Sequence, residues 1–518
     1  MPDSPPEVVE LTRLWRERVT PESLGELHEQ RLAESGTRKS GGAYYTPLHI
    51  VRFIIEHTVI DDDARVLDPA CGCGAFLVAA FRHLLARRAP LDVAGRIHVL
   101  RRCIFGVDLD ERAAAMTRLA LLLVALEGSN DPGDHAALLR DTLPALAAEN
   151  VRVGNSLTTF DWRGETYDAV IGNPPYLNLK RGFLTPDDKA YFESHYTTAA
   201  GQYDAFVLFM ERALQLTRPG GRHGFILPKP VLTNESYEPI RRLLLDAHTI
   251  THVADCGAPF DGAAVEAATI IVRREPARED SAIELLREWR SSGHVRQASL
   301  RDVAGVPLSY LMDDAALAVV TRAMREHPSL GSHCAVFERG IEAGKKALTL
   351  RATGPHSRPT LRGDDVTDAG IAAASWWFEA TPDTTAVWKR RELYDVPEKL
   401  LIRRVANAPI AAVDRDRRWA LNTLYVVHPV DGVSCEWLAA CLNSAFVRWW
   451  FEVRFLSDDR YFPYLRKSQL VQVPIPDPRE RDVARILQLD AAARDAAIRD
   501  AYGVATDRPP ESGSTSAP

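Results

Sequence analysis

The sequence of residues 65–77 is Arg-Val-Leu-Asp-Pro-Ala-Cys-Gly-Cys-Gly-Ala-Phe-Leu. It predicts a short apolar strand, then a glycine turn, then the start of a helix. The strand is expected to end at Asp68 and the helix to begin near Ala75. Gly72 and Gly74 would let the backbone approach a ligand beside the free N–H groups of the new helix. The turn lacks the third glycine of a dinucleotide site and the Lys-Ser/Thr pair of a phosphate loop. Since Asp68 would repel a pyrophosphate, we expect a ligand with a cationic amine.

A second acid ends the next apolar segment, at residues 104–109 (Ile-Phe-Gly-Val-Asp-Leu). Asp108 stands where a carboxylate can bind both hydroxyls of a ribose, as in other nucleoside-binding α/β folds. Either acid alone is more simply explained as a solvated residue that caps a strand or helix. Two acids that end successive strands favour a nucleoside-type cofactor with a positively charged group. The two acids are further apart than in a minimal βαβ unit, so we expect an inserted loop near residues 84–91.

Strand-like and helix-like segments alternate over residues 65–273, which is typical of an α/β sheet with helices on both faces. The expected strands lie near residues 65–68, 103–107, 151–154, 167–172, 223–227, 251–255 and 267–273. The expected helices lie near residues 75–87, 111–127, 203–217 and 237–245. The pattern predicts a doubly wound, Rossmann-like sheet.

The tetrapeptide Asn173-Pro174-Pro175-Tyr176 directly follows the expected strand at residues 167–172. The amide oxygen of Asn173 and the carbonyl of Pro174 can each accept one N–H of a planar amino group. The prolines fix φ, so these acceptors are in place before a substrate arrives. Tyr176 offers a flat face on which a nucleobase can stack. The alternative is a simple strand-ending turn, in which Asn-Pro sequences are common.

The composition is that of an ordinary globular protein. The chain of 518 residues is 46% hydrophobic and 26% charged, which suits two or three domains that each bury a core. We find neither a signal peptide nor an apolar run of about 18 residues, so we expect no membrane contact. Seven scattered cysteines favour a reduced cytoplasm. The pair Cys71-x-Cys73 has the wrong spacing for zinc, and no metal is expected. The net charge of −7 argues against indiscriminate binding of polyanions but permits a local basic cleft.

From about residue 330 the composition shifts to short strand-like runs that carry arginine and tryptophan. Lys345 and Lys346 follow a glycine-containing turn, and Arg403 and Arg404 form a second basic pair. Arginine suits bidentate contacts with guanine and phosphate, so these four side chains are candidate DNA contacts. Any one of them alone is better explained as part of a solvated face.

Several motifs occur in the order found in a known family. They lie at residues 24–32, 38–47, 68–74, 106–109, 153–157, 173–176, 221–228, 340–345, 420–425, 442–444 and 462–476. On these motifs the chain resembles N6-adenine-specific DNA methyltransferases of restriction-modification type, in which an Eco57I-like catalytic domain precedes a TaqI-like specificity domain. The resemblance implies a class I S-adenosylmethionine-dependent methyltransferase fold, followed by a C-terminal mixed α+β target-recognition domain.

The resemblance also implies roles for individual residues. Those that would hold S-adenosylmethionine are Tyr45, Thr46, Pro47, Asp68, Ala70, Cys71, Gly72, Asp108, Leu109 and Asn155. The motif at residues 173–176 would present N6 of a flipped-out adenine for direct methyl transfer. Tyr237 stands in the place of the family's second aromatic residue, although a core position explains it nearly as well. Lys180 and Arg181 are suited to hold the flanking DNA backbone, and a solvated loop explains them equally well.

The same reasoning predicts six segments along the chain. They are a helical N-terminal segment (1–40), the catalytic domain (41–280), a connecting segment (281–329), the target-recognition domain (330–480), a C-terminal helical segment (481–506) and a disordered tail (507–518).

Three alternatives use or retain the same tetrapeptide. RNA methyltransferases and protein-glutamine methyltransferases present a nitrogen in this way, but nothing like residues 330–476 is expected in them. A DNA-recognition subunit with a decayed site is the third, and the intact acids and Asn-Pro-Pro-Tyr motif argue against it. We therefore predict DNA adenine methylation, with double-stranded DNA as the partner. No nuclease cluster is evident before Tyr45, so we expect a restriction endonuclease or other defence protein to be a separate chain. A monomer is the default for this architecture, and we expect one here.

Overall fold

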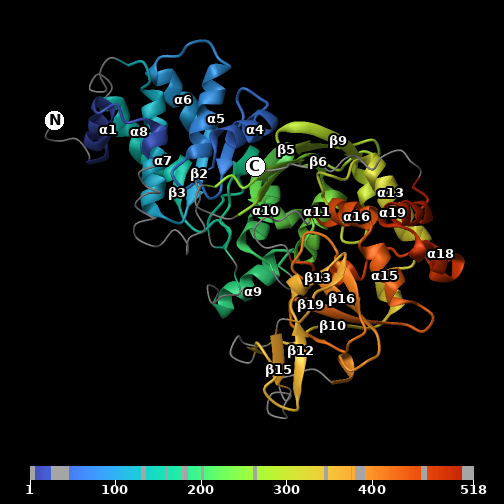
Figure 1. The fold of residues 1–518 in the computed structure, drawn as a ribbon. Helices are drawn as coiled ribbons and strands as arrows, with labels where there is room; N and C mark the ends of the chain where they lie inside the picture. Colours follow the sequence, from blue (N-terminus) through green and yellow to red (C-terminus); the bar gives the residue numbers. More distant parts are fainter. Residues whose placement is uncertain are drawn as a thin grey trace. The chain divides into compact units, whose positions relative to one another are not determined.

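The computed structural model describes residues 6–24, 46–129, 136–158, 160–177, 179, 185–199, 203–260, 265–342, 348–374, 376–379, 391–456 and 464–504. The chain divides into two compact units, residues 1–310 and residues 311–518 (Figure 1). This division lies within residues 281–329, the segment that the sequence predicts to be a connection. The predicted tail at residues 507–518 lies outside the described residues.

The first unit contains a nine-stranded sheet in the order β3-β2-β1-β4-β5-β7-β6-β8-β9. Its strands are β1 (Val66–Asp68), β2 (Ile104–Asp108), β3 (Val151–Val153), β4 (Tyr167–Gly172), β5 (Thr217–Pro228), β6 (Thr249–Gly257), β7 (Ala267–Arg273), β8 (Ala282–Arg287) and β9 (Arg290–Arg296). Strands β1 to β5 are parallel to their neighbours among themselves, and β7 is antiparallel to β5 and β6. The strand order reverses between β1 and β4, as in a doubly wound fold. The predicted sheet is confirmed, and β8 and β9 extend it into the stretch expected to be a connection.

Helices flank these strands. They are α1 (Pro6–Arg16), α4 (Leu48–Thr58), α5 (Ala75–Ala86), α6 (Val93–Cys103), α7 (Glu111–Ala125), α8 (Ala136–Ala145), α9 (Pro186–His195), α10 (Ala205–Leu216), α11 (Glu238–Ala247) and α12 (Gln297–Leu300). Apolar spacing explains how they pack. In α4, for example, Ile50, Val51, Ile54 and Ile55 are buried, so one stripe of the helix faces the core.

The expected loop at residues 84–91 is only partly correct. Helix α5 continues to Ala86, and after a short connection a further helix, α6, occupies residues 93–103. The Asp92 carboxylate accepts a hydrogen bond from the Gly95 N–H at 2.8 Å, which caps the new helix. Ile97 and Leu100 are buried on the face that packs into the core. The insertion between the first two strands is therefore largely helical.

The second unit is sheet-rich, which confirms the predicted mixed α+β character. One sheet has the order β10-β19-β16-β17, and another has the order β11-β15-β12-β18. The strands of this unit are β10 (Cys334–Arg339), β11 (Leu348–Thr349), β12 (Ser357–Leu361), β13 (Val366–Thr367), β14 (Gly370–Ile371), β15 (Trp376–Glu379), β16 (Lys399–Arg403), β17 (Ala411–Asp414), β18 (Trp419–Ala420) and β19 (Leu424–Pro429). Its helices are α13 (Asp314–Glu326), α15 (Cys435–Leu442), α16 (Ala445–Phe455), α17 (Lys467–Leu470), α18 (Val483–Gln488) and α19 (Ala491–Ala501).

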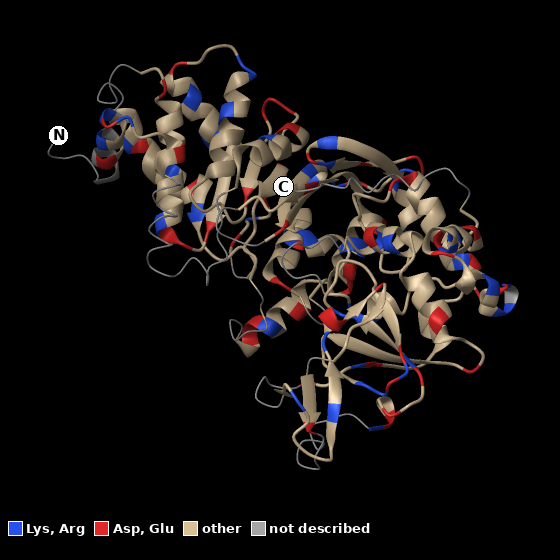
Figure 2. Cartoon of the chain, viewed as in Figure 1, with Lys and Arg blue, Asp and Glu red and all other residues tan. Residues whose placement is uncertain are grey.

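Charge is mixed on both units. Figure 2 shows lysine and arginine interspersed with aspartate and glutamate, so charge alone does not locate a nucleic-acid surface. Within the described ranges, no helix is both long and apolar enough to cross a bilayer. In the same residues, no group of three or more His, Cys, Asp or Glu side chains is placed to hold a metal ion.

Candidate functional site

The carboxyl ends of β1, β2 and β4 bring three of the predicted residues to one edge of the sheet. Asp68 ends β1, Asp108 ends β2, and Asn173 directly follows β4. The strands are parallel and adjacent, with Asp68 opposite Gly106 of β2 and Leu67 opposite Val170 of β4. Ligands of doubly wound sheets bind at this edge, where the strand order reverses. The topology therefore brings the two acids and the Asn-Pro-Pro-Tyr motif to the sheet edge at which this class of fold has its ligand crevice.

Asp68 is a buried carboxyl group. It is only 2% exposed, and its Oδ1 accepts a hydrogen bond from the Ala70 N–H at 3.0 Å. Burial raises the pKa of Asp68 to about 8; the Ala70 N–H opposes this shift and the Asp108 carboxylate adds to it. The carboxyl group is thus poised to lose its proton when a positive charge comes near.

Asp108 organises the glycine turn. Its Oδ2 accepts a hydrogen bond from the Gly72 N–H at 2.8 Å, and its Oδ1 accepts one from the Asp110 N–H at 2.9 Å. The Thr117 hydroxyl donates to the Gly72 carbonyl at 2.7 Å, which holds the turn from its other side. Each carboxylate oxygen has a second lone pair, so Asp108 can still accept hydrogen bonds from a ligand. Leu109, the next residue, is 73% exposed and adds apolar surface beside this acid.

The segment after β3 is tied to the same turn. The Ser156 hydroxyl donates a hydrogen bond to the Pro69 carbonyl at 2.5 Å. Asn155 is exposed, and its Oδ1 accepts a hydrogen bond from the Leu157 N–H at 3.0 Å. Asn155 therefore stands at the edge of the crevice, and its own amide shapes a local turn.

The Asn173 amide is oriented by a residue that is distant in the sequence. Its Nδ2 donates a hydrogen bond to the Thr46 hydroxyl at 3.1 Å, and Thr46 is 3% exposed. Because the nitrogen end binds Thr46, the oxygen end is directed elsewhere. Pro174 is buried, and both prolines restrict the backbone that follows. This contact joins the segment that precedes α4 to the Asn-Pro-Pro-Tyr motif.

Four aromatic rings form a row beside the motif. The ring centroid of Tyr176 lies 6.0 Å from that of Phe260 and 6.3 Å from that of Phe206, and both pairs meet edge to face. Phe206 also contacts Tyr237, with ring centroids 5.1 Å apart. Tyr237 therefore lies near the Asn-Pro-Pro-Tyr motif, and its role as the second aromatic residue stays a prediction. Phe206 and Phe260 were not predicted from the sequence. The first lies in a run with helical spacing and the second in the β6–β7 loop, and neither belongs to a local motif.

Several predicted contacts lie outside the described residues or outside this unit. Tyr45, Lys180, Arg181, Lys345 and Lys346 are not among the described residues.

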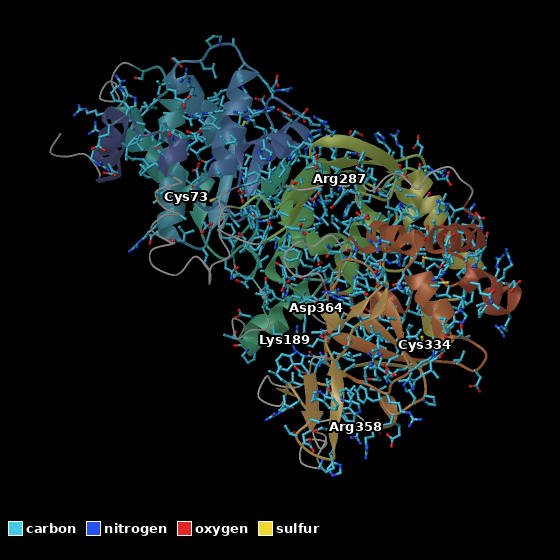
Figure 3. The ribbon with its side chains drawn as sticks, in the orientation of Figure 1. Cys73, Lys189, Arg287, Cys334, Arg358 and Asp364 are labelled. Atoms are coloured by element: carbon cyan, nitrogen blue, oxygen red, sulfur yellow. The ribbon has the colours of Figure 1, made fainter. Side chains whose placement is uncertain are left out.

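Arg403 and Arg404 lie at the end of β16 in the second unit, where both are engaged within the chain. Arg403 forms an ion pair with Asp364 at 2.8 Å (Asp364 is labelled in Figure 3). Arg404 donates to the Asn422 carbonyl at 3.1 Å and lies over the Tyr464 ring. Their role as DNA contacts remains a prediction.

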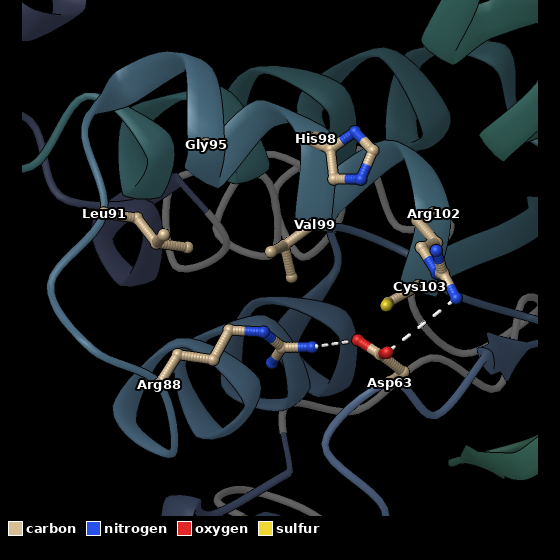
Figure 4. Close-up of a pocket in the computed structure, with 8 residues that line it drawn as sticks. All are labelled: Asp63, Arg88, Leu91, Gly95, His98, Val99, Arg102 and Cys103. Carbon is tan, nitrogen blue, oxygen red and sulfur yellow. Dashed lines mark hydrogen bonds and ion pairs between the residues drawn. The ribbon is translucent and has the colours of Figure 1, made fainter.

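A separate cavity of about 360 Å³ lies away from this crevice. It is lined by Asp63, Arg88, Leu91, Gly95, His98, Val99, Arg102 and Cys103 (Figure 4). Asp63 precedes β1 and Cys103 precedes β2, so the cavity lies at the amino ends of these strands. Asp63 pairs with Arg88 at 2.7 Å and with Arg102 at 3.8 Å. Both arginines of this cavity are thus paired with the same carboxylate, and the crevice at the opposite edge remains the candidate site.

Protein-family models match one segment in each unit. Residues 102–260 match the Eco57I restriction-modification methylase, and residues 358–475 match the TaqI-like C-terminal specificity domain. The resemblance inferred from the motifs is confirmed: the chain carries a methylase domain of the first type, followed by a specificity domain of the second type.

Comparison with individual proteins agrees. The chain is 28% identical over 260 residues to the type II restriction enzyme and methyltransferase RM.Eco57I of Escherichia coli, which covers 41% of this chain and 26% of that protein. It thus spans about a quarter of that relative. It is 25% identical over 356 residues to the type II methyltransferase M.VspI of a Vibrio species, covering 68% of this chain and 77% of the other. It is 22% identical over 478 residues to the type II methyltransferase M.TthHB8I of Thermus thermophilus, which covers 88% of this chain and 95% of that protein.

A solved structure shares the fold over most of the chain. The type IIL restriction-modification enzyme MmeI, solved in complex with DNA, superimposes with a TM-score of 0.55 at 14% identity, covering 96% of this chain and 75% of that one. Similarity at this level of identity bears on the fold alone. It extends the confirmed architecture beyond the segments that match family models.

Proposed function

We propose that this chain, with its Eco57I-type methylase domain and TaqI-like specificity domain, is a site-specific DNA methyltransferase. It transfers a methyl group from S-adenosylmethionine to N6 of an adenine that is flipped out of duplex DNA. The observation that carries the proposal is the Asn173 amide, which Thr46 orients at the carboxyl end of β4, beside the aromatic ring of Tyr176. The names of two matched relatives, a type II restriction enzyme and methyltransferase and a type II methyltransferase, support it.

The crevice fits S-adenosylmethionine, which when bound supplies a methyl group on a positively charged sulfur. Buried Asp68 offers a carboxyl group to a cationic centre, Asp108 can accept hydrogen bonds from ribose hydroxyls, and exposed Leu109 can cover a purine ring. Gly172 lies against Asp68: a Cβ at this position would be 2.7 Å from the Asp68 Oδ1. The residues that would hold the cofactor are Tyr45, Thr46, Pro47, Asp68, Ala70, Cys71, Gly72, Asp108, Leu109 and Asn155.

Asn173 and Pro174 act on the nucleophile. The N6 lone pair of adenine is delocalised into the ring, so the free base attacks poorly. When the Asn173 Oδ1 and the Pro174 carbonyl each accept one N–H, they draw the amine towards tetrahedral geometry and localise the lone pair. No dedicated base is needed, because the amine gains its positive charge in the transition state and loses a proton afterwards. The acceptors stabilise that developing charge.

The aromatic row receives the base. An adenine inside a duplex cannot reach the crevice, and flipping it out costs a few kcal/mol. Stacking on Tyr176, with Tyr237 as the second aromatic, offsets part of that cost. Lys180 and Arg181 would hold the flanking backbone, and Lys345, Lys346, Arg403 and Arg404 of the second unit would contact the target sequence. We further propose a cytoplasmic monomer that works with a separate restriction endonuclease or other defence proteins.

Cofactor binding is expected to depend on pH through Asp68. Its pKa of about 8 in the free protein means that the carboxyl group is mostly protonated at pH 7. A cationic ligand lowers this pKa, so the affinity should rise as pH increases towards 8, and binding near pH 7 should release a proton. Calorimetric titration in buffers of different ionisation enthalpy measures that proton. Asp68→Asn should abolish the release.

Gly172→Ala is expected to weaken S-adenosylmethionine binding about tenfold. Gly172 has a φ of +153°, which costs an alanine roughly 1–3 kcal/mol, and the new methyl group would displace the Asp68 carboxyl group. Equilibrium binding to the purified variant measures the loss. Gly164→Ala is the matched control, because Gly164 has a φ of +67° but no atom within 4 Å of the position that a Cβ would take. An equal loss of affinity in both variants would show that backbone strain, and not the contact with Asp68, is responsible.

Site specificity is tested in a bacterial host that lacks adenine methylation. After expression of the chain, modification-sensitive sequencing of genomic DNA should find N6-methyladenine in one short sequence context. Expression of Asn173→Ala should leave the DNA unmodified. Methylation without a common context would contradict the assignment of sequence recognition to the second unit.

A further inference from the structure

Asp204 occupies a position from which aspartate usually caps its own helix. It precedes α10, with an extended backbone conformation (φ −111°, ψ 161°), yet its side chain accepts no hydrogen bond from the first turn. Instead its Oδ2 accepts a short hydrogen bond from the Tyr237 hydroxyl. Asp204 therefore does not cap α10, as an aspartate at this position usually would, but binds a residue 33 positions away in the sequence.

The environment of Asp204 is unfavourable for a carboxylate. Burial raises its pKa, and the Tyr237 hydroxyl opposes that shift. Its Oδ1 is also buried and accepts no hydrogen bond within the described part of the chain. A buried, incompletely satisfied carboxylate costs stability, so a contact that it makes is a candidate for a functional role.

Asp204 also lies beside the row of rings. The N–H of the next residue, Ala205, donates to the Leu177 carbonyl at 3.0 Å, and Leu177 directly follows the Asn-Pro-Pro-Tyr motif. Phe206 contacts both Tyr237 and Tyr176 edge to face. The Tyr237 ring is thus held at its hydroxyl by Asp204 and at its side by Phe206, which together fix the ring plane.

We infer that Asp204 is a positioning residue for the target base: it holds the Tyr237 ring in the orientation in which the ring stacks on the flipped adenine. This inference rests on the proposed function. It adds a residue that touches neither substrate nor cofactor but acts through the Tyr237 hydroxyl. Because the Tyr237 ring is already ordered in the free protein, DNA binding would not incur the conformational entropy cost of ordering it.

A double-mutant cycle tests the inference. Asp204→Ala and Tyr237→Phe should each lower kcat/KM on duplex DNA about tenfold, the value of one lost hydrogen bond, and the double variant should lose no more than either single variant. Asp204→Asn should retain most activity, because its amide oxygen still accepts from the tyrosine. The losses should shrink when the target adenine is mismatched, since flipping then costs less.

Two controls separate positioning from folding. Affinity for S-adenosylmethionine and the thermal unfolding temperature should stay near those of the unaltered protein in Tyr237→Phe, which keeps the ring. Tyr191→Phe is the matched hydroxyl control: its hydroxyl donates to the Thr158 carbonyl at 2.8 Å, and its loss should leave kcat/KM unchanged.

Additive losses in the double variant, or equal losses on paired and mismatched DNA, would overturn the inference while leaving DNA methylation intact. Asp204→Asn as inactive as Asp204→Ala would also overturn it. If the unaltered protein methylates no DNA, the proposed function fails first, and this inference fails with it.

Discussion

Replacing Asn173 by alanine is expected to lower kcat for methyl transfer by about a hundredfold to a thousandfold. In the proposed mechanism the variant loses one of two acceptors that stabilise charge developing on the amine, and the loss of one such preorganised group typically costs about 10²–10³ in rate. It also loses the hydrogen bond to Thr46 at 3.1 Å, so the segment that precedes α4 is less firmly joined to the motif. Single-turnover kinetics with saturating cofactor measures the chemical step directly.

Asn173→Asp is the matched variant, because it retains a side-chain oxygen acceptor of the same length. We expect it to retain more activity than Asn173→Ala. Affinity for S-adenosylmethionine should fall far less than kcat in either variant, since Asp68 and Asp108 remain. An Asn173→Ala protein that kept a tenth of its activity would contradict the assigned role.

The second large effect is expected on stability, at an ion pair inside the second unit. Lys399 and Asp414 are fully buried and face each other across β16 and β17, with Nζ and Oδ2 2.5 Å apart. Lys399 also donates to the Tyr394 carbonyl at 3.0 Å, and Asp414 accepts from the Arg418 Nε at 2.7 Å. Asp414→Ala would leave the ammonium group of Lys399 buried without its carboxylate. Breaking such a pair from one side costs roughly 3–5 kcal/mol of unfolding free energy.

Amide hydrogen exchange of β16 and β17 measures this loss locally, which avoids treating a two-unit chain as a single transition. Glu342→Ala removes one member of the exposed Arg339–Glu342 pair and should change exchange little. Protection in Asp414→Ala equal to that in the control would contradict a structural role for the buried pair.

Local sequence patterns were sufficient to predict much of the first unit. Strand β1 ends at Asp68, β2 at Asp108 and β4 just before Asn173, because short apolar runs followed by a polar residue or a Gly/Pro turn mark strand ends without reference to the rest of the chain. Parallel strands then bring their carboxyl ends to one edge. The placement of the two acids beside the Asn-Pro-Pro-Tyr motif thus followed from topology alone.

Helix α6 was missed although its signal was present. Val93, Ile97 and Leu100 are spaced as on one helical face, and Asp92 is a suitable cap. Charged residues lie between these apolar positions and a proline precedes them. This local composition is typical of a loop, so a loop was predicted.

Other contacts could not be predicted from one sequence, because they join distant segments. The Thr46–Asn173 hydrogen bond spans 127 positions, and the contact of Phe260 with Tyr176 depends on the path of the β6–β7 loop. The pairing of Asp204 with Tyr237 even opposes the local expectation that Asp204 caps α10. In these cases tertiary packing, and not the local sequence preference, determines which side chains are in contact.

DNA adenine methylation is tested by identifying the molecule that receives the methyl group. The purified chain is incubated with S-adenosylmethionine that carries an isotopically labelled methyl, in separate reactions with duplex DNA, with tRNA and rRNA, and with a protein lysate. Mass spectrometry of the hydrolysed products then identifies the methylated group. We predict label in N6-methyladenine from DNA and its loss with Asn173→Ala. Label that appears only in RNA or protein, or in a DNA base other than adenine, would contradict the account.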